Sequence, residues 1–246
     1  MTDSPPHADL LRWTGFCETN RRRRAVRDFD GRPIPDEDVR AILTEALLAP
    51  SSGNLQPYEF HWIRDGGTKG RVAEACEAQR AAASASTLVV VTAGARIAAR
   101  TGSQHSAYVD RASSLDEGSK AYHRAQWTKF SRFLRIAPLL VWVPLRMFLG
   151  VLNPVHALLP IGPSGMRNWA ARSAIYAAQT LMLAASARGL DSCPMEGFSA
   201  VKVAKLLGLP RDSVIPIVIA LGYRSTDARI EPRWRRTFEN AVVEHD

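Results

Sequence analysis

Ala49-Pro50-Ser51-Ser52-Gly53-Asn54-Leu55-Gln56-Pro57-Tyr58-Glu59-Phe60 is the stretch around which this chain is organised. Two prolines, a glycine and several small polar side chains stand there between a helical pattern and a strand pattern. Such residues build a rigid polar loop, whose neutral donors and acceptors suit a planar ligand rich in heteroatoms, such as a flavin ring. The same residues also fill ordinary turns for backbone reasons, so the loop alone is equally compatible with a plain connector.

The flanks of this loop predict one helix and one strand. Acidic residues at 36–38 stand where a helix N-terminus favours negative charge. Apolar residues at helical spacing follow over 39–47, and Pro50 disfavours the helical conformation at Ala49. Beyond the loop, aromatic residues alternate with polar ones over 58–62, as in a half-buried strand that ends at Gly66-Gly67. The loop is therefore fixed between a buried helix and a sheet.

The remaining periodic segments predict a single domain of mixed helices and strands. We expect helices over 69–79 and 168–188 and buried strands over 87–93 and 215–221. The stretch 191–198 is predicted to be a second loop of a functional site. The chain has no glycine-rich dinucleotide motif and no Walker sequence, so a classical Rossmann or P-loop enzyme is poorly supported.

The segment from about 105 to 165 is interpreted as an apolar insertion or lid. Aromatic residues recur at helical spacing over 127–134 with basic residues between them, and an apolar run follows to Ile161. Four prolines and Arg146 interrupt this run, which leaves no stretch of about 18 apolar residues to cross a bilayer. Long insertions often cover functional sites. Because basic and aromatic residues mix here, peripheral membrane contact through 127–161 is the alternative.

Composition describes a protein with a sizeable core and an excess of positive charge. The 246 residues are 46% hydrophobic and carry a formal net charge of +8. Three widely spaced cysteines offer no disulfide framework, and residues 1–9 lack the order of a signal peptide, so we expect a cytoplasmic protein. No clustered metal ligands are expected. Net charge permits phosphorylated cofactors, acidic lipid or nucleic acid, although no nucleic-acid module is recognisable.

Arginines gather near both ends of the chain. Four stand at 21–24 with a fifth at Arg27, and three more stand at 233, 235 and 236. Charge runs are often only a solvated basic face. Guanidinium groups also bind phosphate oxygens in pairs. The sequence alone leaves both interpretations open.

Four short motifs lie far apart in the chain. They are Arg23-Arg24-Ala25-Val26-Arg27-Asp28-Phe29, Pro50-Ser51-Ser52-Gly53-Asn54-Leu55-Gln56-Pro57, Cys193-Pro194-Met195-Glu196-Gly197-Phe198 and Ala220-Leu221-Gly222-Tyr223. Their order and approximate spacing resemble the FMN-dependent nitroreductase family, over most of residues 18–98 and 166–240. Each motif alone is weak, whereas the combination is specific.

The resemblance implies an α+β fold with a central, mainly antiparallel sheet flanked by helices. It also implies an intertwined homodimer with two FMN sites at the interface, each built from both subunits. In such a protein residues 1–246 form a single nitroreductase-like domain. Ala25 departs from the serine common in the family and removes a hydroxyl donor, and Tyr58 stands where tryptophan is frequent.

The same resemblance implies which residues bind FMN. Arginines of the first motif and the tail would contact the phosphate and ribityl chain, the 50–54 loop would approach the ring from the other subunit, and Gly197 N–H would donate to flavin N5. Glu196 and Gly197 are the predicted catalytic residues. The full predicted set is Arg23, Arg24, Ala25, Arg27, Pro50, Ser51, Ser52, Asn54, Gln79, Pro194, Met195, Glu196, Gly197, Arg233 and Arg235.

The implied activity is an NAD(P)H oxidoreductase that passes hydride or two electrons through flavin N5. The oxidant would be a small electron-poor molecule such as a nitroaromatic compound or a quinone. A dehalogenase or a flavin-cleaving enzyme of the same fold is the enzymatic alternative. A basic protein that binds nucleic acid or a membrane surface is the non-enzymatic one, and we expect no nucleic-acid partner.

Overall fold

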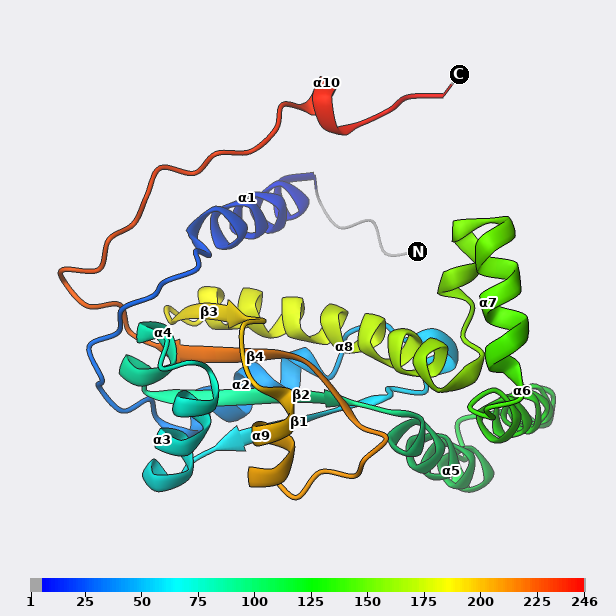
Figure 1. Ribbon diagram of the computed structural model, residues 1–246. Helices are drawn as coiled ribbons and strands as arrows, with labels where there is room; N and C mark the ends of the chain where they lie inside the picture. Colours follow the sequence, from blue (N-terminus) through cyan, green and yellow to red (C-terminus); the bar gives the residue numbers. More distant parts are fainter. Residues whose placement is uncertain (1–5, 246) are drawn as a thin grey trace.

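The computed structural model describes residues 6–245, arranged as a four-stranded sheet with helices on both faces (Figure 1). Residues 1–5 of the N-terminal stretch interpreted above lie outside the described residues. The strands are β1 Tyr58–Ile63, β2 Thr87–Ala93, β3 Asp191–Met195 and β4 Val214–Gly222. The helices are α1 Pro6–Arg22, α2 Asp36–Ala46, α3 Gly66–Ala75, α4 Arg80–Ser84, α5 Ala95–Arg111, α6 Glu117–Ile136, α7 Trp142–Leu152, α8 Gly162–Ala187, α9 Ala200–Leu206 and α10 Phe238–Ala241, with 3-10 turns η1 Ser52–Asn54 and η2 Pro154–Leu158.

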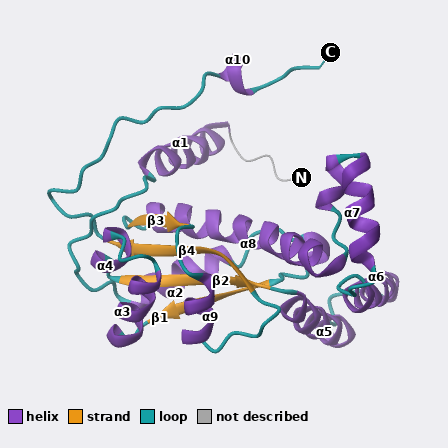
Figure 2. Cartoon of the chain, in the orientation of Figure 1, coloured by secondary structure: helices purple, strands orange, loops and turns teal. Residues whose placement is uncertain are grey.

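The sheet has the order β1-β2-β4-β3, and every neighbouring pair of strands is antiparallel (Figure 2). Strand β2 lies inside the sheet and is buried along its whole length, as its uninterrupted apolar run predicts. Pro216 stands near the beginning of β4, where an absent N–H is tolerated. The predicted α+β class with a mainly antiparallel sheet is confirmed.

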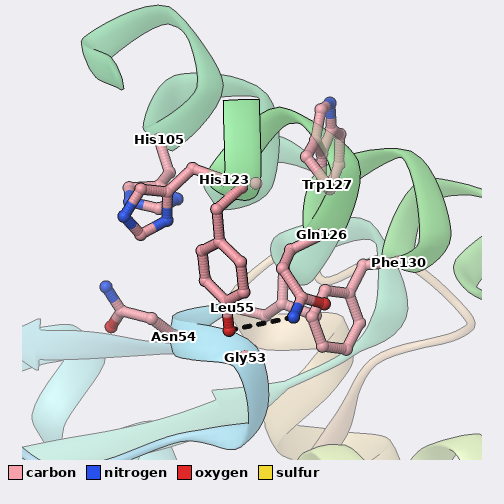
Figure 3. Close-up of a pocket in the computed structure, with 10 residues that line it drawn as sticks. Gly53, Asn54, Leu55, His105, His123, Gln126, Trp127 and Phe130 are labelled. Atoms are coloured by element: carbon pink, nitrogen blue, oxygen red, sulfur yellow. Dashed lines mark hydrogen bonds between the residues drawn. The ribbon is translucent and has the colours of Figure 1, made fainter. Parts of the chain in front are cut away.

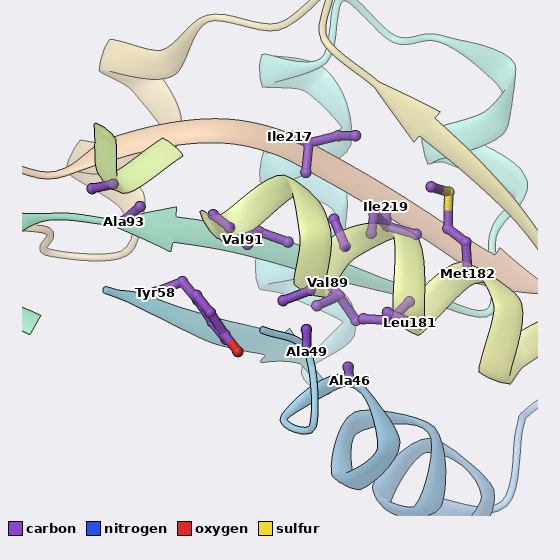
Figure 4. Close-up of a cluster of buried hydrophobic side chains, with 14 of the residues drawn as sticks. Ala46, Ala49, Tyr58, Val89, Val91, Ala93, Leu181, Met182, Ile217 and Ile219 are labelled. Atoms are coloured by element: carbon purple, nitrogen blue, oxygen red, sulfur yellow. The ribbon is translucent and has the colours of Figure 1, made fainter. Parts of the chain in front are cut away.

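Alternate residues of β2 pack into two different cores. Val89, Val91 and Ala93 face the long helix α8. They share a core with Leu181 of that helix and with the other residues that Figure 4 labels. Leu88 and Val90 face the opposite side, which α3, α4 and α9 cover. This division follows from the two-residue period of side chains along a strand. The sheet is thus a buried middle layer that places loops at its two ends.

Three predictions differ from the structure. Gly66-Gly67 do not end the strand in a loop but begin α3, because the Asp65 side chain accepts a hydrogen bond from the Thr68 N–H at 2.6 Å and caps the helix. The helix predicted over 69–79 accordingly ends earlier, at Ala75. The first five residues of the predicted loop 191–198 form edge strand β3, paired with β4. An edge position accommodates Pro194.

The segment from 105 to 165 is mostly helical. Its beginning falls within α5, and α6 contains the aromatic residues predicted at helical spacing. Phe133 of α6 packs edge-on against Trp169 of α8, with ring centroids 6.1 Å apart. Gly162 N–H donates to Ala137 O at 2.7 Å, which closes the α7–η2 excursion at its base. This segment therefore forms a group of helices at one end of the sheet (Figure 1).

The two ends of the chain lie over the same side of the molecule. Helix α1 packs against α8, and the C-terminal segment runs past it (Figure 1). Arg22 donates to Ser186 O at 2.8 Å and to Gly189 O at 2.7 Å, so it ties α1 to the carboxyl end of α8. Large apolar side chains of α1 remain exposed, among them Leu11, Trp13 and Phe16.

Candidate functional site

Arginines from both ends of the chain meet around one cavity of about 200 Å³. Its lining comes from two segments that are some two hundred residues apart in the sequence. The lining residues are Arg23, Arg24, Ala25, Arg27, Arg229, Ile230, Glu231, Pro232, Arg233, Trp234 and Arg235. We call this the arginine cavity. The structure thus brings together the first motif and the tail arginines.

Hydrogen bonds from arginine side chains to backbone carbonyls hold the tail in place at this cavity. The Arg233 guanidinium donates to Arg21 O at 2.8 Å and to Arg23 O at 2.5 Å. Arg24 donates to Glu231 O. These two side chains therefore position the tail, whereas Arg23 and Arg27 are not used in any of these contacts. They are the side chains that the cavity can offer to a ligand.

Most arginines of the arginine cavity have no carboxylate partner within the described residues, the exception being Arg229, which pairs with Glu231. Over residues 6–245, no carboxylate forms an ion pair with Arg23, Arg24, Arg27, Arg233 or Arg235. Partial burial, and then repulsion from Arg235 and Arg24, lowers the pKa of Arg23. Burial and the neighbouring arginines likewise lower the pKa of Arg233. A multiply charged anion would relieve this repulsion.

The first motif reaches this position because it runs along the edge of the sheet. Val26 N–H donates to Ser192 O at 3.1 Å, and Ala25 forms a parallel bridge with Ser192. Val26 is fully buried, which fixes the register of the neighbouring arginines. The positive charge of Arg27 acts on Cys193, where it opposes the upward shift that burial causes in the thiol pKa. The first and third motifs therefore adjoin.

Gln79 connects this region to the predicted catalytic residues. Its side-chain amide donates to Gly197 O at 2.5 Å. The next residue, Arg80, pairs with Asp28 of the first motif at 2.6 Å. Glu196 and Gly197 follow β3 and are exposed to solvent, whereas Met195 is buried in the core and Pro194 is partly buried. The structure thus groups Gln79, Glu196 and Gly197 on the arginine side of the molecule.

The 50–54 loop lies elsewhere and borders a second cavity of about 270 Å³ (Figure 3). Two of its residues, Gly53 (φ 60°) and Asn54 (φ 53°), adopt left-handed backbone conformations, and so does Gln56 (φ 39°) just after the loop. Ser51 Oγ accepts a hydrogen bond from Gln56 N–H at 2.9 Å and holds this turn. Backbone strain of this kind is concentrated at functional sites. We call this the loop cavity.

Helices α5 and α6 supply the other walls of the loop cavity. The lining residues are Gly53, Asn54, Leu55, Gly102, His105, Tyr122, His123, Gln126, Trp127 and Phe130. The His105 and His123 rings meet edge-on with centroids 5.3 Å apart, and burial followed by repulsion from His123 lowers the pKa of His105. A wall of this composition can stack on a flat ring. No residue of α7 lines this cavity, whose helical walls come from α5 and α6.

Within one chain, the loop cavity and the arginine cavity lie at opposite ends of the sheet. The loop enters β1 at Tyr58, which faces Ala93, and Ala93 pairs with Val214 at the beginning of β4. The first motif joins β3 at Ser192, which faces Leu221 near the end of β4. Strand β4 has nine residues, or roughly 30 Å at about 3.3 Å per residue. Pro50, Ser51, Ser52 and Asn54 are therefore not part of the same chain's arginine site.

Comparison with known proteins establishes the family of this chain. The family model named Nitroreductase family matches residues 21–223. The chain belongs to the nitroreductase family. A protein named NADH dehydrogenase from Thermus thermophilus is 29% identical over 223 residues, which cover 90% of this chain and 92% of that protein. The predicted family and oxidoreductase class are thus confirmed at the level of the family.

Solved nitroreductase structures have the same fold. The Bacillus subtilis protein ydfN, assigned as a nitroreductase, superposes with a TM-score of 0.76 at 23% identity, covering 95% of this chain and 100% of that one. A nitroreductase-assigned protein from Exiguobacterium sibiricum in complex with FMN gives a TM-score of 0.65 at 22% identity, covering 94% and 97%. At these identities the likeness shows the nitroreductase fold alone.

The sequence did not identify the second cavity. His105 and His123 are separated by the turn between α5 and α6, so only the helical hairpin brings their rings together. Helical spacing of His123, Trp127 and Phe130 was the available signal. Across residues 6–245, no group of three or more His, Cys, Asp or Glu side chains is placed to hold a metal ion.

Proposed function

We propose that this protein is an FMN-dependent NAD(P)H oxidoreductase that reduces small electron-poor molecules such as nitroaromatic compounds or quinones. The observation that carries the proposal is the arginine cavity, which holds several cations without a carboxylate partner among the described residues. The pair Arg80–Asp28 links its first motif to Gln79, which bonds Gly197. The relative that is named NADH dehydrogenase and the FMN-containing structure support the donor and the cofactor.

The residues present fit the phosphate of FMN. A dianionic phosphate needs several fixed donors to replace its water, and Arg23 and Arg27, together with Arg235, would supply them. Arg24 and Arg233 would act indirectly, because their guanidinium groups hold the tail against the first motif. Glu196 and Gly197 would border the ring. When bound, FMN supplies the two-electron chemistry between NAD(P)H and the oxidant.

We infer that the working unit is a homodimer in which the 50–54 loop serves the partner's flavin. The loop and the arginine cavity lie at opposite ends of one sheet, so a single chain supplies each half of a site in a different place. Exposed apolar residues on α8, including Ile175 and Tyr176, and on α1, including Trp13, offer a surface for a second copy. A symmetric pair completes two sites at once.

The loop cavity supports a planar oxidant. Trp127 and Phe130 present aromatic surface beside Gly53, and Tyr122 and His105 add polar atoms. Electron-poor rings of nitroaromatic compounds and quinones match this mixture of stacking surface and hydrogen-bond donors. The proposal also places the enzyme in the reducing cytoplasm, since Cys17, Cys76 and Cys193 are unpaired thiols.

The decisive experiment is purification followed by reconstitution with FMN. We expect a yellow protein with flavin absorption that oxidises NADH or NADPH in the presence of a nitroaromatic compound or a quinone, with the two donors and several oxidants compared in parallel. A colourless protein that cannot be reconstituted with FMN would overturn the proposal. A flavin-loaded protein that reduces none of these oxidants would overturn the substrate class alone.

A further inference from the structure

Helix α7 presents an unusually apolar surface to solvent. None of its residues is buried, although it is the most hydrophobic of the described helices that have ten or more residues. Val151 is 85% exposed and Leu140, which precedes the helix, is 74% exposed. The exposed large apolar residues of this region are Leu139, Leu140, Val141, Val143, Leu145, Met147, Phe148, Val151, Leu152, Val155 and Leu158. We call these residues the α7 surface.

Hydrogen bonds hold both ends of the α7 region in place. Trp142 Nε1–H donates to Ile136 O at 2.9 Å, and His156 Nδ1 lies 3.0 Å from Leu149 O. Helix α7 packs on η2 and touches α8, and it stands out from the body beside α6 (Figure 1). A contiguous exposed apolar patch on an ordered element marks an interaction site.

Charge around this surface indicates the kind of partner. Between Gly118 and Leu190 the sequence has nine Lys and Arg residues and no Asp or Glu, so this segment alone exceeds the net charge of +8 of the whole chain. Its exposed cations include Lys129, Arg132 and Arg135 on α6 and Arg167 and Arg172 on α8. Within the described part of the chain, none of these five forms an ion pair with a carboxylate.

We propose that the α7 surface docks on an anionic lipid bilayer, with its apolar side chains in the interface and the surrounding cations on the headgroups. A helix of 11 residues is about 16 Å long, well short of the ~30 Å hydrocarbon core. Among the described residues, no helix combines the length and hydropathy needed to cross a membrane. Helix α7 therefore lies in the interface plane.

Lipid explains these residues better than a second copy does. A symmetric contact of the α7 surface with itself would set the unpaired cations of two chains against each other. An anionic leaflet instead supplies the opposite charge, and juxtaposed cations strengthen binding within a Debye length of the surface. Docking would also bring α6, a wall of the loop cavity, close to acceptors dissolved in the membrane.

Sedimentation of the full-length, flavin-loaded protein with vesicles tests this proposal. The probes are vesicles of phosphatidylcholine alone and of phosphatidylcholine mixed with phosphatidylglycerol, each at low and physiological salt. We expect binding to the anionic vesicles that weakens as salt increases. The double change Phe148→Asp with Val151→Asp should lower the partition coefficient at least about tenfold, and Arg132→Gln should lower it roughly fivefold on anionic vesicles. Both positions on α7 are exposed, so the fold does not depend on them.

The control is Val201→Asp on α9, a site that is 81% exposed and lies on the opposite face of the sheet. It should bind vesicles like the parent protein. Flavin absorption and molar mass by light scattering are measured on every variant. Failure of the parent protein to bind either kind of vesicle would overturn the proposal. Loss of the dimer in the α7 double variant would also overturn it, because the surface would then belong to a subunit interface.

Discussion

The arginine cavity and the loop cavity differ in the side chains that line them and in their position on the sheet. At the arginine cavity, the two chain ends are joined by Arg233 and Arg24, and the first motif is bound to the sheet edge at Ser192. The 50–54 loop is also ordered, but it faces α5 and α6 at the other end of the sheet. One region gathers positive charge, and the other offers a strained backbone beside aromatic side chains.

This difference shows that a region can be held in place by its own chain and still contain only part of the chemistry of a site. Intrachain hydrogen bonds position both regions, from Arg233 at the arginine cavity and from Gln56 N–H to Ser51 Oγ in the loop. Their chemistry is divided, because cations lie at one end of β4 and aromatic surface lies at the other. Under the proposed function, association of two chains is what joins the halves. Substitutions at the two regions should therefore affect different properties, namely FMN affinity and dimerisation.

The largest effect is expected from Arg27→Glu at the arginine cavity. Replacing an unpaired cation by an anion removes a phosphate donor and adds repulsion, so FMN affinity should fall about a thousandfold, or roughly 4 kcal/mol. Flavin fluorescence titration of the apoprotein measures this. Arg211→Glu, an exposed arginine outside the cavity, is the matched control and should leave affinity unchanged. Unchanged affinity in both Arg27→Glu and Arg235→Glu would reject the phosphate site.

The next largest effect is expected at the proposed dimer interface on α8. Ile175 lies on the outer face of α8 and is 40% exposed. Ile175→Arg should weaken dimerisation about a hundredfold by burying an unpaired charge, and flavin should be lost although the arginine cavity is intact. Analytical ultracentrifugation and flavin content are read together. Val201→Arg on the opposite face should change neither, and a monomer that retains FMN normally would contradict the shared site.

Local pattern explains which parts of the fold were predictable from the sequence. The buried strand over 87–93 follows from its uninterrupted apolar run. Local pattern gave only a mixture of helices and strands, whereas the α+β class was implied by the resemblance to a family. Proximity of Arg27 to Arg235 did not follow from any local pattern, because it joins the chain ends, and it was predicted only through resemblance to a family.

Long-range pairing explains what the sequence did not show. Residues 191–195 form a strand only because β4 and the first motif lie on either side of them. Asp65 starts a helix through Gly66, which has low helix propensity, because its carboxylate caps the turn. The loop cavity required a helical hairpin whose geometry sequence spacing does not specify. Each of these features depends on contacts that composition and periodicity leave open.

A smaller effect should separate backbone strain from steric contact in the loop. Gly53 has φ +60°, and a Cβ placed there would come within 2.3 Å of the Phe130 ring. Gly31 has φ +75° with open space around it, so it is the matched control. Gly31→Ala should cost about 1 kcal/mol and Gly53→Ala about 3 kcal/mol in the free energy of unfolding. Urea denaturation measures both.

Combining Gly53→Ala with Phe130→Leu should recover part of the extra cost, since the smaller side chain can move away from the new methyl group. FMN affinity of the single variant should change less than in Arg27→Glu, because the arginine cavity is untouched. Equal destabilisation by Gly31→Ala and Gly53→Ala would show that the Phe130 contact relaxes freely and that the loop wall is not rigid.

The smallest effect is expected from Tyr58→Phe, directly after the loop. The Tyr58 side chain is 4% exposed, and its hydroxyl has no hydrogen-bond partner within residues 6–245 (Figure 4). Burial raises the pKa of this phenol, so the group is neutral at physiological pH. Removing an unpaired buried hydroxyl should leave the stability of the FMN-free chain unchanged or raise it by up to about 1 kcal/mol. Tyr122→Phe, which removes the hydroxyl that accepts from Gln126 at 3.0 Å, should instead lower it slightly. A loss above about 1 kcal/mol for Tyr58→Phe would contradict this prediction, because it would show that the buried hydroxyl contributes to the stability of the fold.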